Sequence, residues 1–150
     1  MKVIKGDLVQ LAKDGKFDVI VHGCNCFCTM GGGIAAQIKK EFPSAYAADL
    51  TTRNWTQPKL GKYTSTKIYN DDKILHVVNA YTQFHFGTGR NVNYEAIYTC
   101  FEKLRLEFSA KKIGIPMIGA GLAGGNWNII ETIISEIMKR EDITLVEYEV

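Results

Sequence analysis

The sequence predicts an α/β fold, a three-layer α/β/α sandwich with a mixed central sheet, formed by residues 1–150 as a single domain. Short apolar runs of strand type alternate with longer segments whose apolar residues recur at helical spacing. Two of the strand-like runs flank a short polar turn and predict a hairpin. Two glycine-rich turns, residues 30–34 and 118–125, each follow a strand-like run and precede a helix-like one. This alternation is typical of a sheet covered by helices on both faces.

The first half of the chain contains two predicted strands and two predicted helices. Residues 17–22 form a β-branched run typical of a strand buried on both faces. Pro43 stops the first full helix, and Ser44 is expected to cap the second. The expected elements are a strand from Val3 to Gly6, a helical turn from Leu8 to Leu11, a strand over residues 17–22, a helix over residues 34–42 and a helix over residues 45–52.

The second half begins with the predicted hairpin, whose polar turn is residues 70–72. Two later segments have a broad apolar face at helical spacing and predict amphipathic helices. The expected elements are strands over residues 63–69 and 74–80, a loop over residues 84–93, a helix that includes residues 97–108, a strand over residues 113–118, a helix over residues 127–139 and a strand over residues 144–150.

Composition places the chain among ordinary folded domains, with 46% hydrophobic and 23% charged residues. The formal net charge of +2 is too small for the basic stripe that phosphate-backbone binding requires. Apolar runs are shorter than the ~20 residues needed to span a bilayer, and the first residues have no signal-peptide core. We therefore expect a cytoplasmic protein, a monomer, with no membrane partner.

Three of the four cysteines lie close together at Cys24, Cys26 and Cys28. This spacing does not fit a disulfide framework, so all four thiols are expected to be reduced. With His22 they could form a zinc site, but residues at i and i+2 of a strand point to opposite faces, and structural zinc sites use a distant second pair of ligands. We predict no metal.

Both glycine-rich turns have the composition of a diphosphate-binding site. A helix N-terminus presents unpaired N–H groups, and glycine lets the backbone approach an anion closely. Residues 119–124 match the dinucleotide-binding pattern G-x-G-x-x-G, but a Rossmann fold needs further strands and only residues 125–150 follow. A P-loop is excluded because neither turn ends in Gly-Lys-Ser or Gly-Lys-Thr.

The sequence resembles the macrodomain family of ADP-ribose-binding proteins. Four segments carry the resemblance, which extends over the whole chain: Gly-Asp-Leu at residues 6–8, Val-His-Gly-Cys-Asn at 21–25, Gly-Gly-Gly-Ile-Ala at 31–35 and Pro-Met-Ile-Gly-Ala-Gly-Leu at 116–122. The greatest likeness is to the small stand-alone branch with ADP-ribose 1″-phosphate phosphatases and the enzyme that removes terminal ADP-ribose from glutamate. Phage and bacterial members of this branch exist.

The resemblance implies a set of binding residues for ADP-ribose. Asp7 and the Leu8 backbone would contact adenine, Tyr148 would pack on it, and Asn25 would reach the distal ribose. Asp7 as a helix cap, Tyr148 as an ordinary strand residue and the glycines as plain turns are the alternatives. The full implied set is Asp7, Leu8, Asn25, Gly31, Gly32, Gly33, Ile34, Ala35, Asn79, Gly119, Ala120, Gly121, Leu122, Ala123, Gly124 and Tyr148.

Two residues are the catalytic candidates, His22 and Asn25. Many macrodomains have an asparagine where this chain has His22, and histidine titrates near neutrality, as general acid–base catalysis requires. The alternative is a structural histidine bonded to the backbone. Residues 84–90 could form a mobile flap whose Arg90 pairs with a phosphate, or an ordinary exposed loop.

Two positions depart from the glutamate-deconjugating members. Where those proteins have a lysine after the hairpin strand and an aspartate in the second glycine turn, this chain has Ala80 and Ala123. The leading hypothesis is therefore an enzyme that binds ADP-ribose and dephosphorylates ADP-ribose 1″-phosphate without a cofactor. The alternatives are a non-catalytic ADP-ribose reader and a hydrolase that removes ADP-ribose from protein or nucleic acid.

Overall fold

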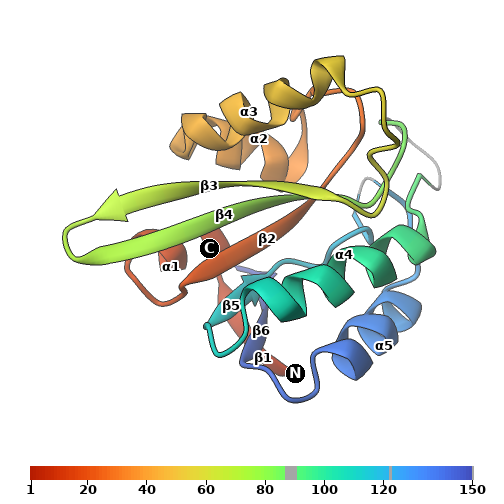
Figure 1. The fold of residues 1–150 in the computed structure, drawn as a ribbon. Coiled ribbons are helices and arrows are strands. Elements are labelled where there is room, and N and C mark those ends of the chain that lie inside the picture. Colours follow the sequence, from red (N-terminus) through yellow and green to blue (C-terminus); the bar gives the residue numbers. More distant parts are fainter. Residues whose placement is uncertain (87–90, 122, 150) are drawn as a thin grey trace.

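Six strands form one mixed sheet in the order β1-β6-β5-β2-β4-β3 (Figure 1). The computed structural model describes residues 1–86, 91–121 and 123–149. All neighbouring strands run parallel except β3, which pairs antiparallel with β4 and forms the predicted hairpin. The strands are β1 (Lys2–Gly6), β2 (Val19–Cys24), β3 (Tyr63–Asn70), β4 (Lys73–Tyr81), β5 (Ile113–Ile115) and β6 (Ile143–Tyr148).

Helices cover both faces of this sheet, which confirms the predicted three-layer α/β/α fold. In Figure 1 α2 and α3 lie above the sheet, and α4 and α5 lie below it. Helix α1 packs into the same hydrophobic cluster as α2 and α3. The helices are α1 (Leu8–Lys13), α2 (Gly33–Glu41), α3 (Pro43–Leu50), α4 (Tyr94–Glu107) and α5 (Trp127–Ile137), and the 3-10 helix η1 (Thr51–Asn54) follows α3.

Strand β2 lies inside the sheet and divides the core into two clusters. Val19 and Val21 pack on the side of α4 and α5, whereas Ile20 and Cys24 pack on the side of α1, α2 and α3. Side chains alternate between the faces of a strand, so a strand covered on both sides needs apolar residues at successive positions. The β-branched run that predicted this strand has this composition.

Several element boundaries differ from the sequence prediction. Helix α3 begins at Pro43, with Phe42 at the N-cap position and no capping side-chain bond from the described residues, so Ser44 does not cap it. Proline suits the first helical position because its missing N–H has no intrahelical partner there. Strand β5 ends at Ile115, and residues 116–118 belong to the following loop because Pro116 cannot donate to the sheet.

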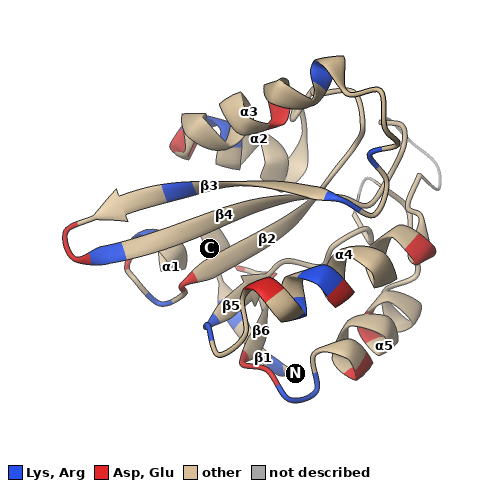
Figure 2. Ribbon diagram, viewed as in Figure 1, with Lys and Arg blue, Asp and Glu red and all other residues tan. Residues whose placement is uncertain are grey.

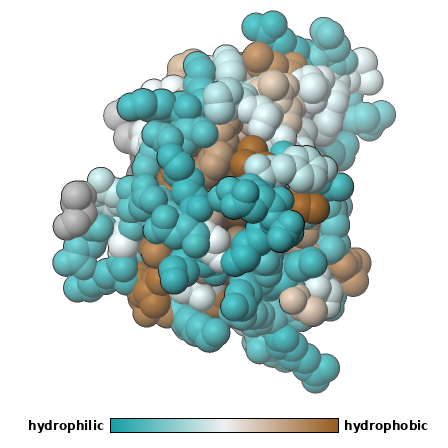
Figure 3. Space-filling model, turned by 90° about the vertical axis from the view of Figure 1, so that its left-hand side faces the viewer, coloured by the Kyte–Doolittle hydropathy of each residue, from teal (hydrophilic) through white to brown (hydrophobic). Residues whose placement is uncertain are grey.

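Charged residues are spread over helices, strands and turns of the described chain (Figure 2). The face in Figure 3 is mainly hydrophilic, with apolar side chains in small separate groups. Among the described residues, no helix has the length and apolar character needed to cross a membrane. The same residues contain no cluster of three or more metal-ligating side chains, and the four cysteines have free thiols.

Candidate functional site

A cavity of about 500 Å³ opens at the carboxyl ends of β2 and β5. In open parallel sheets ligands bind at this edge, where the connecting loops meet. The largest part of its wall extends from the end of β2 to the start of α2: Gly23, Cys24, Asn25, Thr29, Met30, Gly31, Gly32, Gly33, Ile34 and Ala35. The remaining lining residues are Asp49, Gln83, Phe86, Pro116, Met117, Ile118, Gly119, Gly121 and Ala123.

The first glycine-rich turn brings the N-terminus of α2 to the cavity. Gly32 is the N-cap residue of α2, and no described side chain caps this helix. In α1, α4 and α5, by contrast, Asp7, Asn93 and Asn126 accept hydrogen bonds from the first turn. The first N–H groups of α2 thus have no side-chain acceptor among the described residues, and their partial positive charge favours an anion.

The backbone that leads into α2 adopts uncommon conformations. Cys28 has φ 57° and Met30 has φ 40°, a left-handed region that non-glycine residues rarely occupy. The Met30 side chain is buried in the cluster below α2 and α3, which holds the segment in place. Strain of this kind is concentrated at binding and catalytic sites, where the surrounding fold fixes it.

The glycines of the second glycine-rich turn differ in how closely other atoms surround them. A Cβ at Gly119, whose φ is +74°, would come within 2.7 Å of Val92, and one at Gly125 within 2.6 Å of the Gly119 carbonyl oxygen. These two glycines are required by packing. Among the described residues, no heavy atom lies within 4 Å of a Cβ built at Gly121, which lines the cavity. Gly121 thus leaves open space beside the cavity.

Asn25 lies at the cavity with a fixed side chain. Its Oδ1 accepts a hydrogen bond of 2.8 Å from the Phe27 N–H, and its Nδ2 donates one of 2.7 Å to Thr29 Oγ1. An amide has two donor hydrogens and two acceptor lone pairs, so each end of the side chain retains one unused position. Asn25 can therefore accept from and donate to a ligand while its orientation stays fixed.

His22 and Asn79 do not line the cavity. Both side chains are completely buried, and His22 Nε2 lies 2.7 Å from Asn79 Oδ1. Asn79 Nδ2 in turn donates to the Ala45 carbonyl of α3 and to Thr64 Oγ1. Burial lowers the pKa of His22 to about 4, so the imidazole is neutral at pH 7. This burial favours the structural alternative of the sequence analysis, although the bonding partner is the Asn79 side chain and not the backbone, and it does not suit a general acid.

The residues implied for adenine also lie outside the cavity wall. Asp7 caps α1 by accepting from the Gln10 N–H at 3.1 Å, and Gln37 of α2 donates to both of its carboxylate oxygens. Leu8 is part of the core below α2 and α3. Tyr148 is exposed at the end of β6, opposite Gly6 in the register. These residues share one end of the sheet, and their contact with adenine remains a prediction.

The cavity brings together most of the implied phosphate-binding residues. Asn25, the first glycine-rich turn through Ala35, and Gly119, Gly121 and Ala123 line it. Ala120 and Gly124 belong to the same loop but do not line the wall. Leu122 and part of the predicted flap, residues 87–90, lie outside the described residues.

Sequence analysis did not identify Asp49 as a site residue. Asp49 lies on α3, its relative exposure is 1%, and it lines the cavity. The available signal was an acidic residue within the otherwise apolar helix segment 45–50. Charged side chains are seldom fully buried without a partner, but the sequence does not show which face of a helix is covered.

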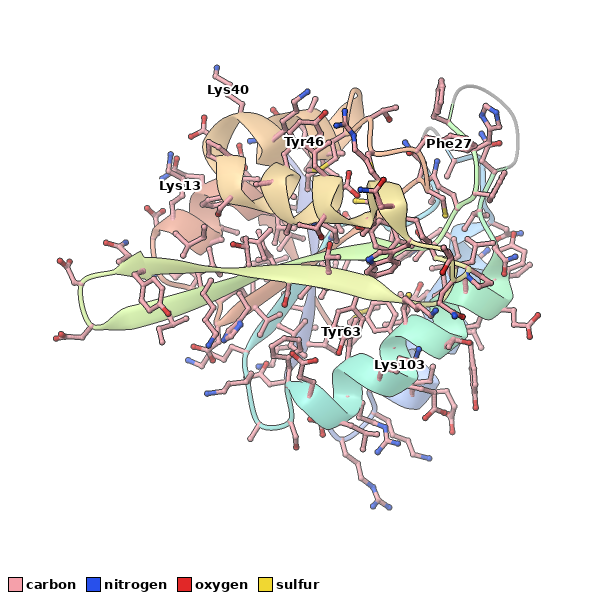
Figure 4. All side chains as sticks on the ribbon, turned by 45° about the horizontal axis from the view of Figure 1, so that its top comes forward. Lys13, Phe27, Lys40, Tyr46, Tyr63 and Lys103 are labelled. Atoms are coloured by element: carbon pink, nitrogen blue, oxygen red, sulfur yellow. The ribbon has the colours of Figure 1, made fainter. Side chains whose placement is uncertain are left out.

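Aromatic side chains gather beside the cavity. Phe27, Phe84 and Phe86 are 45%, 58% and 49% exposed, and the ring of Phe27 lies 5.2 Å from that of Phe84 and 5.9 Å from that of Phe86. Phe86 also lines the cavity. Figure 4 shows Phe27 at the end of the molecule opposite the hairpin turn. The exposed rings offer an apolar surface next to Asn25, two residues before Phe27.

A glycine-lined cavity at the carboxyl ends of parallel strands, with a free helix N-terminus in its wall, is characteristic of proteins that bind phosphorylated nucleotides. The chain belongs to the Macro domain family, whose model matches residues 21–134. This confirms the resemblance seen in the sequence.

Three relatives are similar to this chain in sequence. It is 41% identical over 155 residues to an uncharacterised 17.5 kDa protein from the tk-vs intergenic region of Enterobacteria phage T4, covering 99% of this chain and 97% of the phage protein. An ADP-ribose 1″-phosphate phosphatase of Debaryomyces hansenii is 26% identical, over 91% of this chain and 93% of that protein. A DNA ADP-ribosyl glycohydrolase of Mycobacterium tuberculosis is 24% identical, over 95% of this chain and 40% of that protein.

Solved structures share the fold. The macrodomain of Mycobacterium tuberculosis DarG superimposes with a TM-score of 0.80 at 22% identity, covering 99% of this chain and 97% of that one. Thermosipho africanus DarTG in complex with ADP-ribose gives a TM-score of 0.79 at 18% identity, covering 97% of this chain and 40% of that one. At these sequence identities the comparison shows a shared fold and nothing more specific.

Proposed function

We propose that this protein binds ADP-ribose in the cavity, with the pyrophosphate between the two glycine-rich turns and the distal ribose beside Asn25. The observation that carries the proposal is the uncapped N-terminus of α2, which opens onto the same cavity as Gly121. The free N–H groups supply donors and positive potential for the pyrophosphate. The unused donor and acceptor of Asn25 suit a pair of ribose hydroxyls.

Substitution of Gly121 with alanine tests this arrangement. A Cβ there meets no described atom within 4 Å, so we expect an unchanged melting temperature. The methyl group would displace a pyrophosphate held close to the backbone, and we expect the affinity for ADP-ribose to fall about tenfold or more by isothermal titration calorimetry. Leu106→Ala, on the exposed side of α4, serves as the control and should bind like the wild type. Unchanged affinity in Gly121→Ala would contradict the proposed pyrophosphate position.

The reaction that we assign to the site is hydrolysis of ADP-ribose 1″-phosphate. Water would attack the terminal phosphorus, the bond between phosphorus and the C1″ oxygen would break, and ADP-ribose and inorganic phosphate would leave. The Debaryomyces hansenii relative named as this phosphatase supports the assignment, because its likeness extends over most of both chains. Donors at the α2 N-terminus can stabilise developing negative charge on an oxygen. Asn25 remains the catalytic candidate, whereas the burial of His22 argues against its role.

Removal of ADP-ribose from a macromolecule is the second candidate. The exposed rings of Phe27, Phe84 and Phe86 support it, because they adjoin the cavity near Asn25, where a group attached to the distal ribose would emerge. Exposed aromatic faces stack on nucleobases, and the Mycobacterium tuberculosis relative is named for action on ADP-ribosylated DNA. The third candidate, a reader without turnover, is supported by alanine at positions 80 and 123.

A phosphorus NMR time course with ADP-ribose 1″-phosphate separates these candidates. Growth of free phosphate that is lost in Asn25→Ala supports the phosphatase. Release of ADP-ribose from an ADP-ribosylated oligonucleotide or peptide, without phosphate release, supports the hydrolase. Shifted pyrophosphate resonances without turnover on any of these substrates support the reader. Resonances that the protein leaves unchanged would contradict ADP-ribose binding itself.

A further inference from the structure

The buried carboxylate of Asp49, a residue of the cavity wall, has a hydrogen-bond partner at only one of its two oxygens among the described residues. Asp49 Oδ1 accepts a hydrogen bond of 2.8 Å from the Tyr81 hydroxyl, and Lys59 Nζ lies 3.9 Å from the same oxygen. Oδ2 is buried and has no hydrogen-bond partner among the described residues. A buried acceptor without a donor is costly, and more so when it belongs to a carboxylate. Most such atoms therefore have a partner that completes the site.

The residues around Asp49 hold its orientation. The Tyr81 hydroxyl also lies 2.9 Å from Thr64 Oγ1, so the phenol is fixed from two sides. Lys59 Nζ donates to the Cys26 carbonyl at 3.1 Å and lies 4.3 Å from the centre of the Tyr81 ring. Its ammonium group provides the charge that partly offsets burial of the carboxylate. The carboxylate is thus held in a preformed arrangement built by α3, β4 and the loop before β3.

The missing donor is not supplied by the neighbouring thiol. Cys24 also lines the cavity, but its Sγ lies 3.5 Å from His22 Nε2, within the polar group below α3. Asn25 and Thr29, on the same wall, are bonded to each other, and neither donates to Oδ2. None of the described residues donates to Oδ2, so this oxygen is left to accept a hydrogen bond from a ligand that reaches it.

The chemistry of ADP-ribose restricts which ligand group this is. A pyrophosphate oxygen carries negative charge and is repelled by a carboxylate, and the glycine-rich turns offer it better partners. A ribose hydroxyl is a donor, and a carboxylate is an acceptor only. We propose that Asp49 Oδ2 accepts a hydrogen bond from a hydroxyl of the distal ribose, which makes Asp49 a specificity-determining residue of the site. This assignment rests on the proposed binding of ADP-ribose.

Asp49→Asn tests the assignment with two ligands that differ by the distal ribose. The substitution keeps the shape of the side chain and an acceptor for Tyr81, but replaces Oδ2 with an amide donor. We expect the affinity for ADP-ribose to fall about tenfold or more, while the affinity for ADP changes less than about twofold. Calorimetric titration measures both. Asp142→Asn, a matched change at a half-buried aspartate that accepts a hydrogen bond from Lys2, should leave both affinities unchanged.

Equal weakening of both ligands, or no weakening of ADP-ribose, would overturn the contact. Should Asp49→Asn fail to fold, the wild type can be titrated with ADP-ribose analogues that lack one hydroxyl of the distal ribose. One of these analogues is expected to bind about tenfold more weakly than ADP-ribose, and equal affinities for all of them would overturn the proposal. A wild-type protein that binds neither ADP-ribose nor ADP would refute the proposed function, and the Asp49 contact with it.

Discussion

The two faces of the central sheet differ in what they bury. On the side of α4 and α5 the core cluster is formed by apolar side chains such as Ile97, Phe101 and Ile134. On the side of α1, α2 and α3 the strands also carry His22 and Asn79, whose hydrogen bonds reach α3. Apolar burial stabilises a fold without directional requirements, whereas buried polar groups demand matched partners. Both faces bury an apolar cluster and contribute to the cavity wall, but on the second face a buried polar network is added, and its hydrogen bonds require matched partners.

The largest effect is expected from the apolar face. Phe101 of α4 is fully buried, and Phe101→Ala should lower the free energy of unfolding by about 3–5 kcal/mol because it removes packing and leaves a cavity. Urea denaturation measures this change. If the two faces have separate roles, the variant that remains folded at low temperature binds ADP-ribose with wild-type affinity. Weaker ADP-ribose binding by the folded Phe101→Ala protein would contradict separate roles for the two faces of the sheet.

The polar face should make stability depend on pH. The pKa of His22 is lowered by burial from 6.5 to about 4, so between these values the unfolded chain binds a proton that the native protein does not. The free energy of unfolding is therefore not reduced by His22 above pH 6.5. It falls by roughly 3 kcal/mol as the pH decreases from 6.5 towards 4, because protonation of this histidine favours the unfolded chain. Denaturation curves measured at several pH values test this. His22→Gln should show a smaller slope in that interval, and an identical slope would contradict the assignment.

The second glycine-rich turn contacts the apolar face, and a smaller effect is expected there. A Cβ at Gly119 would meet Val92 at 2.7 Å and Ile130 at 3.1 Å, in a left-handed backbone conformation. Gly119→Ala should therefore cost roughly 1–3 kcal/mol of unfolding free energy, which thermal denaturation would detect. Gly121→Ala in the same turn is the matched control, because its Cβ meets no described neighbour within 4 Å. Equal melting temperatures for the two variants would show that the turn adapts without strain.

Much of the architecture followed from local patterns. Strand and helix periodicity predicted every strand and helix of the described chain except the 3-10 helix η1, and the hairpin was correct within a residue at its ends: residues 63–69 and 74–80 against Tyr63–Asn70 and Lys73–Tyr81. Both glycine-rich turns could be recognised in the sequence, because glycine content at a strand end is a local feature, and residues of both line the cavity. The boundary errors near residues 44 and 116 arose where proline chemistry shifted the end of an element.

Local sequence patterns predicted less of the candidate site than of the fold. His22 and Asn79 were expected in the cleft because they lie near strand ends, but the side of the sheet to which they point is covered by α3. Asp49 was missed because its importance depends on the segments that surround α3, which are distant in sequence. Lys59 and Tyr81 approach it from a loop and a strand that no local pattern connects.

The sequence by itself determined the alternation of strands and helices, the hairpin, the two glycine-rich turns and the family. These features depend on backbone conformation and on periodicity, which are properties of neighbouring residues. Tertiary structure alone decided which polar side chains are sealed below α3 and which face the cavity. Burial and charge pairing arise between elements that are far apart in the chain, so His22 is completely buried, and Asp49, which lines the cavity, has an Oδ2 atom without a partner among the described residues.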